Sequence, residues 1–247
     1  MTPIVVIPAR LASSRLPGKP LADIAGRPMI VQVMLRALEA GIGPVVVAAG
    51  DAAIVAAVEA AGGRAVLTDP DLPSGSDRVQ RALATLDPDG KFDVVVNLQG
   101  DVPTIDPAVI RAALAPLADP TIDIGTLVVP IADDAEAATD SFVKAACAFL
   151  PGAAVAPALY FSRAAIPWGE GPRWHHIGIY AYRRAALARF VTLAESPLER
   201  REGLEQLRAL EAGMRIGCAR IAHGPFGVDT PADLERARRI LADGEST

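Results

Sequence analysis

Residues 4–20 read IVVIPARLASSRLPGKP. A short aliphatic run stops at a proline, and a loop of small residues follows that carries the cations Arg10, Arg15 and Lys19. A helical pattern then opens at Pro28. In such a strand–loop–helix unit, backbone N–H groups can approach an anion while neighbouring cations neutralise it. The stretch predicts a phosphate-binding loop at the end of a strand; the alternative is a solvated, positively charged turn.

The first half of the chain alternates strands with helices. Asp51 can cap one of these helices, which Gly62-Gly63 would end, and Leu38 is expected on the inward face of another. The expected strands are 4–7, 45–48, 65–67 and 93–98, and the expected helices are 30–38, 51–61, 79–86 and 106–114. This alternation predicts a mostly parallel sheet with helices on both sides.

From about residue 122 the alternation of strands and helices stops, and strands follow one another with little helix between them. The expected strands are 122–129, 143–149, 158–162, 177–182 and 215–221; the expected helices are 184–193, 197–212 and one that starts at Pro231 with Thr230 as its N-cap. The uncharged run 145–162 is broken by Pro151 and Gly152, so we expect two buried strands and a turn rather than a membrane span. We expect a single α/β domain over 1–247, with a smaller mixed or antiparallel lobe at about 122–215.

Composition narrows the class of protein. The 247 residues are 51% hydrophobic and 21% charged, as in a globular protein with a sizeable core. The net charge of −5 argues against nucleic-acid binding. Cys147 and Cys218 form no paired-spacing motif, and we interpret them as two inert buried thiols in a cytoplasmic protein. The N-terminal apolar run lacks a basic leader, so we expect a strand there and not a signal peptide.

Two carboxylates follow expected strands. Asp101 comes after the strand at 93–98, and Asp229 comes shortly after the strand at 215–221. In open α/β sheets, ligands bind beyond the carboxyl ends of the strands, where Arg10 also lies. Carboxylates beside a phosphate site repel the substrate unless a metal stands between them, and Mg²⁺ suits such oxygen ligands. The alternative is that both residues serve only as turn or helix-cap residues.

The sequence lacks the motifs of several other classes of enzyme. No Gly-x4-Gly-Lys-Ser/Thr motif occurs, and no Gly-x-Gly-x-x-Gly motif follows a strand, which disfavours a P-loop enzyme and a dehydrogenase. No Ser/His/Asp set stands out, and three histidines cannot form a rich metal site.

Eight blocks of sequence resemble the 3-deoxy-manno-octulosonate cytidylyltransferase family, and they run in the family's order over nearly the whole chain. The blocks are 8–21 (PARLASSRLPGKPL), 74–78 (SGSDR), 97–101 (NLQGD), 159–168 (LYFSRAAIPW), 176–183 (HIGIYAYR), 196–199 (SPLE), 204–208 (LEQLR) and 227–231 (GVDTP). The resemblance implies a Rossmann-like nucleotidyltransferase fold. It also implies that CMP passes from CTP to the anomeric hydroxyl of 3-deoxy-D-manno-octulosonate (Kdo), giving CMP-Kdo and pyrophosphate for lipopolysaccharide biosynthesis.

The resemblance also assigns roles to residues. Arg10 and Lys19 would hold the triphosphate, and Asp101 and Asp229 would hold Mg²⁺. The nucleotide-binding set would be Pro8, Ala9, Arg10, Ser14, Lys19, Ser74, Gly75, Ser76, Arg78 and Gln99. The acidic sugar would be bound by Arg15, Gln99, Arg163, His176, Tyr180, Glu205 and Gln206. The family implies a homodimer formed through the lobe that contains residues 158–168, with no nucleic-acid or membrane partner.

Some of the residues assigned to the acidic sugar could instead have a purely structural role. Tyr180 could be a core residue, Glu205 and Gln206 could lie on a solvated helix face, and Arg163 could pair with a carboxylate. His175 is expected at the surface, because His176 is the histidine in register with the family.

Two departures from the family pattern leave the acceptor open. Val102 stands where the family usually has Glu after Gln-Gly-Asp. After the second strand the family usually has Ala-Thr-Asp, whereas this chain has Ala48-Ala49-Gly50 with Asp51 one place later. An 8-amino Kdo analogue or a sialic-acid-like sugar is therefore an alternative acceptor. A non-catalytic nucleotide-binding protein is the alternative from another functional class.

Overall fold

A computed structural model describes residues 1–12 and 16–242. The chain forms two compact units: unit 1 is Met1–Arg111 together with the segment from Pro225 onward, and unit 2 is Ala112–Gly224. The expected lobe at 122–215 falls within unit 2. No helix among the described residues is both long and apolar enough to cross a membrane.

Unit 1 is built on a parallel sheet in the order β5-β4-β1-β6. The strands are β1 (Pro3–Ala9), β4 (Val45–Ala49), β5 (Ala65–Leu67) and β6 (Val94–Asn97). All residues of β4 and β6 are buried, because helices cover a parallel sheet and its strands therefore need aliphatic side chains throughout. The predicted parallel α/β arrangement is confirmed.

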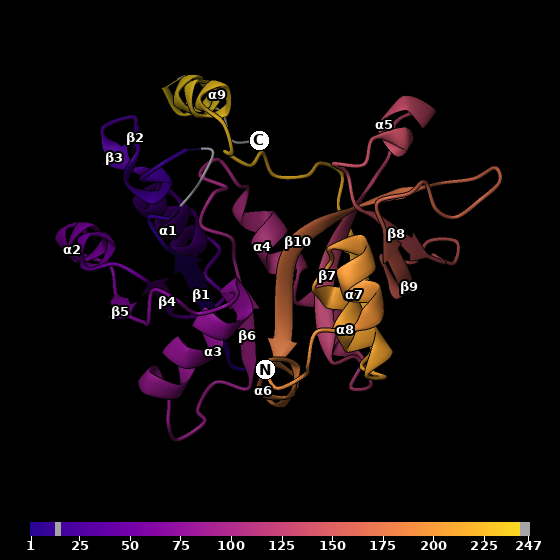
Figure 1. The fold of residues 1–247 in the computed structure, drawn as a ribbon, viewed down its shortest axis with the longest axis horizontal. Coiled ribbons are helices and arrows are strands. Elements are labelled where there is room, and N and C mark those ends of the chain that lie inside the picture. The colour runs from indigo at the N-terminus through magenta and orange to yellow at the C-terminus, as the bar shows by residue number, and fades with distance from the viewer. Residues whose placement is uncertain (13–15, 243–247) are drawn as a thin grey trace. The chain divides into compact units, whose positions relative to one another are not determined.

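The helices of unit 1 are α1 (Met29–Glu39), α2 (Ala52–Ala60), α3 (Gly75–Leu86), α4 (Pro107–Ala112), which ends at the unit boundary, and α9 (Pro231–Ala242). A 3-10 turn η1 (Lys19–Leu21) and a hairpin of β2 (Asp23–Ile24) and β3 (Arg27–Pro28) precede α1. Figure 1 shows the yellow helix α9 beside this indigo hairpin. Leu234 of α9 and Val228 pack with Ile24 and Met29 in one apolar cluster. That packing brings the C-terminal segment back to the N-terminal loop.

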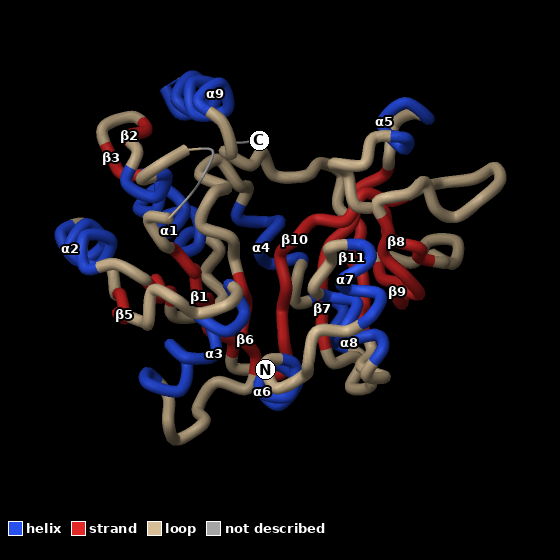
Figure 2. The backbone as a smooth tube through the Cα atoms, in the orientation of Figure 1, coloured by secondary structure: helices blue, strands red, loops and turns tan. Residues whose placement is uncertain are grey.

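Unit 2 is mostly antiparallel, as expected. Its strands are β7 (Ile124–Pro130), β8 (Lys144–Cys147), β9 (Val155–Ser162), β10 (Trp174–Arg183) and β11 (Ile216–Arg220), drawn in red in Figure 2. The pairings run β10–β7–β11–β9–β8, and β8 also pairs with β10, so the ring of strands closes on itself. The predicted pair of strands within 145–162 is confirmed as β8 and β9. The short helical segments are η2 (Ala115–Ala118), α5 (Asp134–Ala138), α6 (Arg184–Phe190), α7 (Pro197–Glu202) and α8 (Gln206–Glu211).

Four predictions about single helices, strands or residues were wrong. The helix predicted over 197–212 is two helices, because Gly203 ends α7 in the left-handed conformation (φ +66°). The first strand continues through Pro8, which lies beyond the last β1–β6 pair, Val6↔Asn97, where its missing N–H breaks no ladder bond. Leu38 is 49% exposed at the end of α1.

The fourth concerns Asp51. It stands at the N-cap position of α2, but its side chain makes no capping bond there. Its Oδ2 instead accepts a hydrogen bond from the Leu11 N–H at 2.8 Å. By contrast, Thr230 caps α9 as predicted, since its Oγ1 accepts from the Asp233 N–H at 3.2 Å and Pro231 is the first helical residue.

Candidate active site

A pocket of about 440 Å³ lies in unit 1, past the carboxyl ends of β1 and β6 and beside the first residues of α3. This is where an open α/β sheet binds its ligands. Its lining mixes cations, carboxylates and small residues: Pro8, Ala9, Arg10, Ala12, Lys19, Pro20, Leu72, Ser74, Gly75, Arg78, Gln99, Gly100, Asp101 and Asp229.

Most of the predicted nucleotide-binding set lines this pocket. Pro8, Ala9, Arg10, Lys19, Ser74, Gly75, Arg78 and Gln99 do so, together with both predicted metal ligands. Ser76 is buried in α3 and is not part of the lining. Ser14 and Arg15 lie outside the described residues. Sequence reasoning missed Ala12, Pro20, Leu72 and Gly100: three lie inside or beside the quoted blocks, whereas Leu72 carries no signal of its own.

Lys19 joins the two carboxylates. Its ammonium Nζ donates to Asp101 Oδ2 at 2.9 Å and to Asp229 Oδ1 at 3.2 Å, and also to the Val228 carbonyl at 2.9 Å. The Lys19 side chain is 14% exposed, against 33% for Asp101 and 46% for Asp229. Three residues far apart in the sequence thus meet at one point of the pocket.

The backbone holds the two carboxylate loops together without help from Lys19. The Val228 N–H donates to the Asp101 carbonyl at 2.8 Å, and the Val228 side chain is fully buried in the α9 cluster. The Asp229 N–H donates to Asp233 Oδ2 at 3.1 Å. The backbone positions of Asp101 and Asp229 are therefore set by the fold.

These carboxylates fit a divalent cation such as Mg²⁺. A single cationic atom, Lys19 Nζ, already contacts an oxygen of each one, so both can reach one ion. Carboxylate oxygens are the ligands that Mg²⁺ prefers. No cluster of three or more His, Cys, Asp or Glu side chains suited to a metal occurs among the described residues. Water and phosphate oxygens would have to complete the shell, as is usual for Mg²⁺ at nucleotides.

Arg78 of α3 organises one wall of the pocket. It is only 2% exposed, and its guanidinium donates to Thr68 Oγ1 at 2.6 Å, to the Asp69 carbonyl at 2.9 Å and to the Pro70 carbonyl at 3.0 Å. Burial lowers the pKa of Arg78, and the nearby charge of Arg10 lowers it further. The loop that carries Leu72 is thus folded around a buried cation.

Gly50, one of the departures from the family pattern, has a packing reason. A Cβ at this position would stand 2.9 Å from Arg78 Nη1 and 3.2 Å from the Cβ of Arg10. The Arg78 guanidinium would have to shift to accept a side chain here, and the contact with Arg10 would be tight. Asp51, one place later than in the family pattern, holds the segment that follows β1 by accepting a hydrogen bond from the Leu11 N–H.

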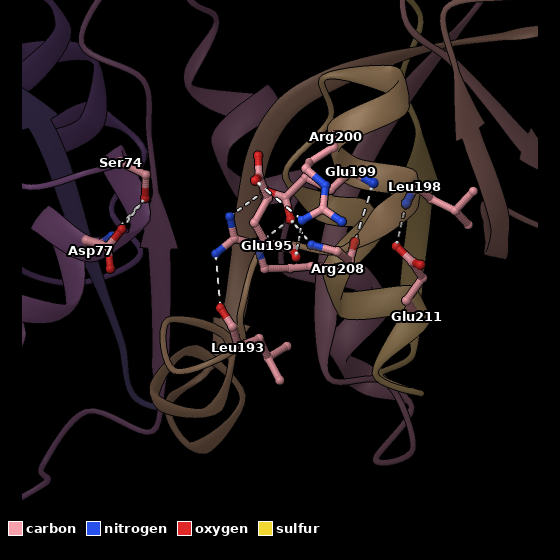
Figure 3. Close-up of polar contacts among 10 residues, drawn as sticks. Ser74, Asp77, Leu193, Glu195, Leu198, Glu199, Arg200, Arg208 and Glu211 are labelled. Carbon is pink, nitrogen blue, oxygen red and sulfur yellow. Dashed lines mark hydrogen bonds and ion pairs between the residues drawn. The ribbon is translucent and has the colours of Figure 1, made fainter.

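The first turn of α3 presents small groups to the pocket. Ser74 is its N-cap: Ser74 Oγ accepts from the Asp77 N–H at 3.2 Å and donates to Asp77 Oδ2 at 2.7 Å (Figure 3). The cap fixes Ser74 and Gly75 beside the pocket.

Three of the residues predicted to bind the acidic sugar lie close together in unit 2. His176 is buried: its Nε2 lies 3.0 Å from Thr126 Oγ1, and its ring centroid lies 5.5 Å from that of Tyr180. Burial lowers the pKa of His176 to about 3, so the ring is neutral, and burial also raises the pKa of Tyr180. The negative charge of Glu205 contributes to the rise at Tyr180.

Gln206 begins α8, a helix that an ion pair joins to α7. Its Nε2 is buried without a hydrogen-bond partner among the described residues. Arg208 of the same helix forms a bidentate pair with Glu199 of α7, and Arg208 Nη1 donates to the Leu193 carbonyl at 3.4 Å (Figure 3). Glu199 also completes a capping box with Ser196. Gln206 is therefore a buried residue, which excludes the solvated-face alternative for it.

Arg163 is exposed and engaged by backbone carbonyls. Its Nε donates to the Glu202 carbonyl at 2.9 Å and its Nη1 to the Asp140 carbonyl at 3.1 Å. Beside it, Lys144 is fully buried and donates to the carbonyls of Thr139, Phe142 and Arg163. Burial lowers the pKa of Lys144. The guanidinium of Arg163 is thus held by a network that the sequence did not reveal.

Two smaller predictions in unit 2 needed correction. Cys218 is buried but Cys147 is only half-buried. A hydrogen bond with Cys147 raises the pKa of Cys218, and burial raises it further, so the two thiols lie close together despite their separation in sequence. His175 is half-buried rather than a surface residue, and its ring packs edge-on against Phe142 with centroids 4.6 Å apart.

Comparison with known proteins gives a consistent result over nearly the whole chain. Residues 4–216 match a family model described as "Cytidylyltransferase". A curated protein of Paramagnetospirillum magneticum named 3-deoxy-manno-octulosonate cytidylyltransferase is 59% identical, over 98% of each chain. A protein of the same name from Methylobacterium radiotolerans is 64% identical, over 97% of this chain and 96% of the other.

Solved structures agree. A structure of CMP:2-keto-3-deoxy-manno-octonic acid synthetase complexed with CTP is 42% identical, covers 99% of this chain and 100% of its own, and gives a TM-score of 0.91. A nucleotidyl transferase from Methanothermobacter gives a TM-score of 0.64 at 16% identity, over 99% of both chains, and supports the fold alone.

Proposed function

Because this chain belongs to the 3-deoxy-manno-octulosonate cytidylyltransferase family, we propose that it transfers CMP from CTP to the anomeric hydroxyl of Kdo, giving CMP-Kdo and pyrophosphate. The observation that carries this proposal is the pocket where Lys19, Asp101 and Asp229 meet beside Arg10 and the start of α3. The product would supply lipopolysaccharide biosynthesis in the cytoplasm.

The reaction needs positioning and charge neutralisation more than a covalent catalyst. The anomeric oxygen forms a bond to the α-phosphorus of CTP, the bond from that phosphorus to the pyrophosphate oxygen breaks, and the hydroxyl proton leaves to solvent. Arg10 and Lys19 bind the triphosphate and stabilise the charge on the departing pyrophosphate. The small residues Ser74 and Gly75 leave room for the nucleoside, and Arg78 holds the loop that faces it.

Asp101 and Asp229 would hold Mg²⁺. When bound, this ion would polarise the α-phosphate and neutralise its charge. Backbone contacts hold the two loops that carry these carboxylates, so the loops lie beside each other without a bound nucleotide.

The residues of unit 2 would serve the acceptor. Neutral His176 can exchange hydrogen bonds with sugar hydroxyls, and the buried amide of Gln206 has donors to offer. Tyr180, Glu205, Arg163 and Gln99 complete the set that the resemblance assigns, and Arg15 would pair with the sugar carboxylate.

We further propose a homodimer formed through the segment around β9. Leu159 is 66% exposed and Trp168 98% exposed, and large apolar side chains in such positions suit an interface between two copies.

The test is an assay of pyrophosphate release with CTP, Mg²⁺ and Kdo, with chromatography to identify CMP-Kdo. An 8-amino Kdo analogue and a sialic acid serve as competing acceptors, and EDTA tests the metal requirement. Release with another acid but not with Kdo would overturn the acceptor, and CTP binding without release for any acid would favour a non-catalytic protein.

A variant tests the carboxylate role within the same assay. Asp101→Asn should lower turnover by about two orders of magnitude or more, as expected when a group that neutralises transition-state charge is lost. Asp89→Asn, at an exposed turn, is the matched control and should retain full activity. Near-normal turnover of Asp101→Asn would remove Asp101 from the site.

A further inference from the structure

We propose that Lys19 is an exchangeable counter-ion: its ammonium neutralises Asp101 and Asp229 in the free protein, and a divalent cation entering there displaces it toward the triphosphate of CTP. This inference rests on the proposed function, which assigns Mg²⁺ to the same two carboxylates. It adds a second task to Lys19, which the reaction otherwise uses only to bind phosphate.

The contacts of Lys19 fully occupy its ammonium. An ammonium has three N–H donors, and Nζ has three acceptors within 3.2 Å: Asp101 Oδ2, Asp229 Oδ1 and the Val228 carbonyl. Its side chain is 14% exposed, so little of it faces solvent. In this arrangement Lys19 has no donor left for a phosphate.

The ammonium and a metal ion compete for the same place. A cation bound by both carboxylates would stand within a few ångströms of Nζ, where two like charges repel strongly in a partly desolvated site. The backbone at both residues does not depend on the ammonium, because the Val228 N–H donates to the Asp101 carbonyl and the Asp229 N–H donates to Asp233 Oδ2. Exchange of one cation for another is therefore a local event.

The displaced ammonium has a destination in the same pocket. Lys19 and Arg10 both line it, and a triphosphate there would offer oxygens to the freed donors. Metal and CTP should consequently assist each other's binding, and this coupling must be reciprocal.

The first experiment measures Mn²⁺ binding to the CTP-free protein by electron paramagnetic resonance. Lys19→Met removes the competing charge, so Mn²⁺ should bind at least about tenfold tighter, which is about 1.4 kcal/mol. Lys91→Met is the matched control, because Lys91 is an exposed lysine of unit 1 outside the pocket, and its affinity should equal that of the wild type. Adding Asp101→Asn to Lys19→Met should abolish the gain.

The second experiment uses the wild-type protein and does not depend on a variant that folds. The chain contains three lysines: exposed Lys91, fully buried Lys144 and Lys19. Limited acetylation followed by mass spectrometry reports the accessibility of each amine. Mg²⁺ alone should raise labelling of Lys19 several-fold relative to Lys91, and Mg²⁺ with CTP should lower it again.

The counter-ion role would be overturned if Lys19→Met bound Mn²⁺ no more tightly than the wild type. It would also be overturned if saturating Mg²⁺ left the acetylation of Lys19 unchanged. An absence of Mn²⁺ binding in every protein at millimolar metal would overturn both the counter-ion role and the metal assignment. The transfer reaction is tested separately by CMP-Kdo formation, so its failure is distinguishable from either result.

Discussion

Replacement of Arg78 by methionine should loosen the pocket wall and weaken CTP binding. The change removes three hydrogen bonds of 2.6, 2.9 and 3.0 Å from a guanidinium that is 2% exposed. Bonds from a charged donor each contribute about 1.5–3 kcal/mol. Two of the freed acceptors belong to Asp69 and Pro70, whose exposed positions let water replace the bonds.

The net loss of stability should therefore be about 2 kcal/mol, well below the sum of the three bonds. For a chain of this size that corresponds to a fall of about 4–8 °C in the melting temperature. Because the loop with Leu72 also bounds the nucleotide pocket, the KM for CTP should rise at least about tenfold while kcat changes less.

Thermal unfolding and initial rates over a range of CTP concentrations measure both effects. Arg78→Lys is the companion variant: it keeps the charge but cannot make the forked contacts, so it should also raise KM. Arg81→Met, at an exposed position of the same helix, should behave as the wild type. A melting temperature and a KM that both stay unchanged in Arg78→Met would refute the reasoning.

Three further predictions concern unit 2. The pKa of His176 is lowered to about 3 from an ordinary value of 6.5, so between these values the unfolded chain binds a proton at this ring and the folded chain does not. As the pH falls from 6.5 to 3, the free energy of unfolding should therefore fall by up to about 1.4 kcal/mol per pH unit, and denaturant titrations of His176→Asn should lack this slope. Arg208→Met leaves the buried carboxylate of Glu199 unpaired and should cost about 3–5 kcal/mol in urea unfolding, whereas a loss under about 1 kcal/mol would contradict the role of the pair. Trp168→Asp should convert the proposed dimer to monomers in light scattering, and an unchanged mass would exclude Trp168 from the interface.

Elements whose signal is local could be predicted from the amino-acid sequence. Unbroken aliphatic runs predicted the buried parallel strands β1, β4 and β6, because a strand covered on both faces needs apolar side chains throughout. Thr230-Pro231 predicted the start of α9, since a cap acts within its own helical turn. The ordered blocks identified the family and most of the predicted nucleotide-binding residues that line the pocket.

Ion pairs and hydrogen bonds between residues distant in the sequence are visible only in the folded chain. Lys19 lies 82 residues from Asp101 and 210 from Asp229, and no spacing rule predicts that one ammonium joins them. Asp51 stands where a helix cap is expected, yet it bonds to Leu11 40 residues away. Such contacts depend on which loops the sheet and the α9 cluster bring together, and that is a property of the packed chain rather than of any segment of it.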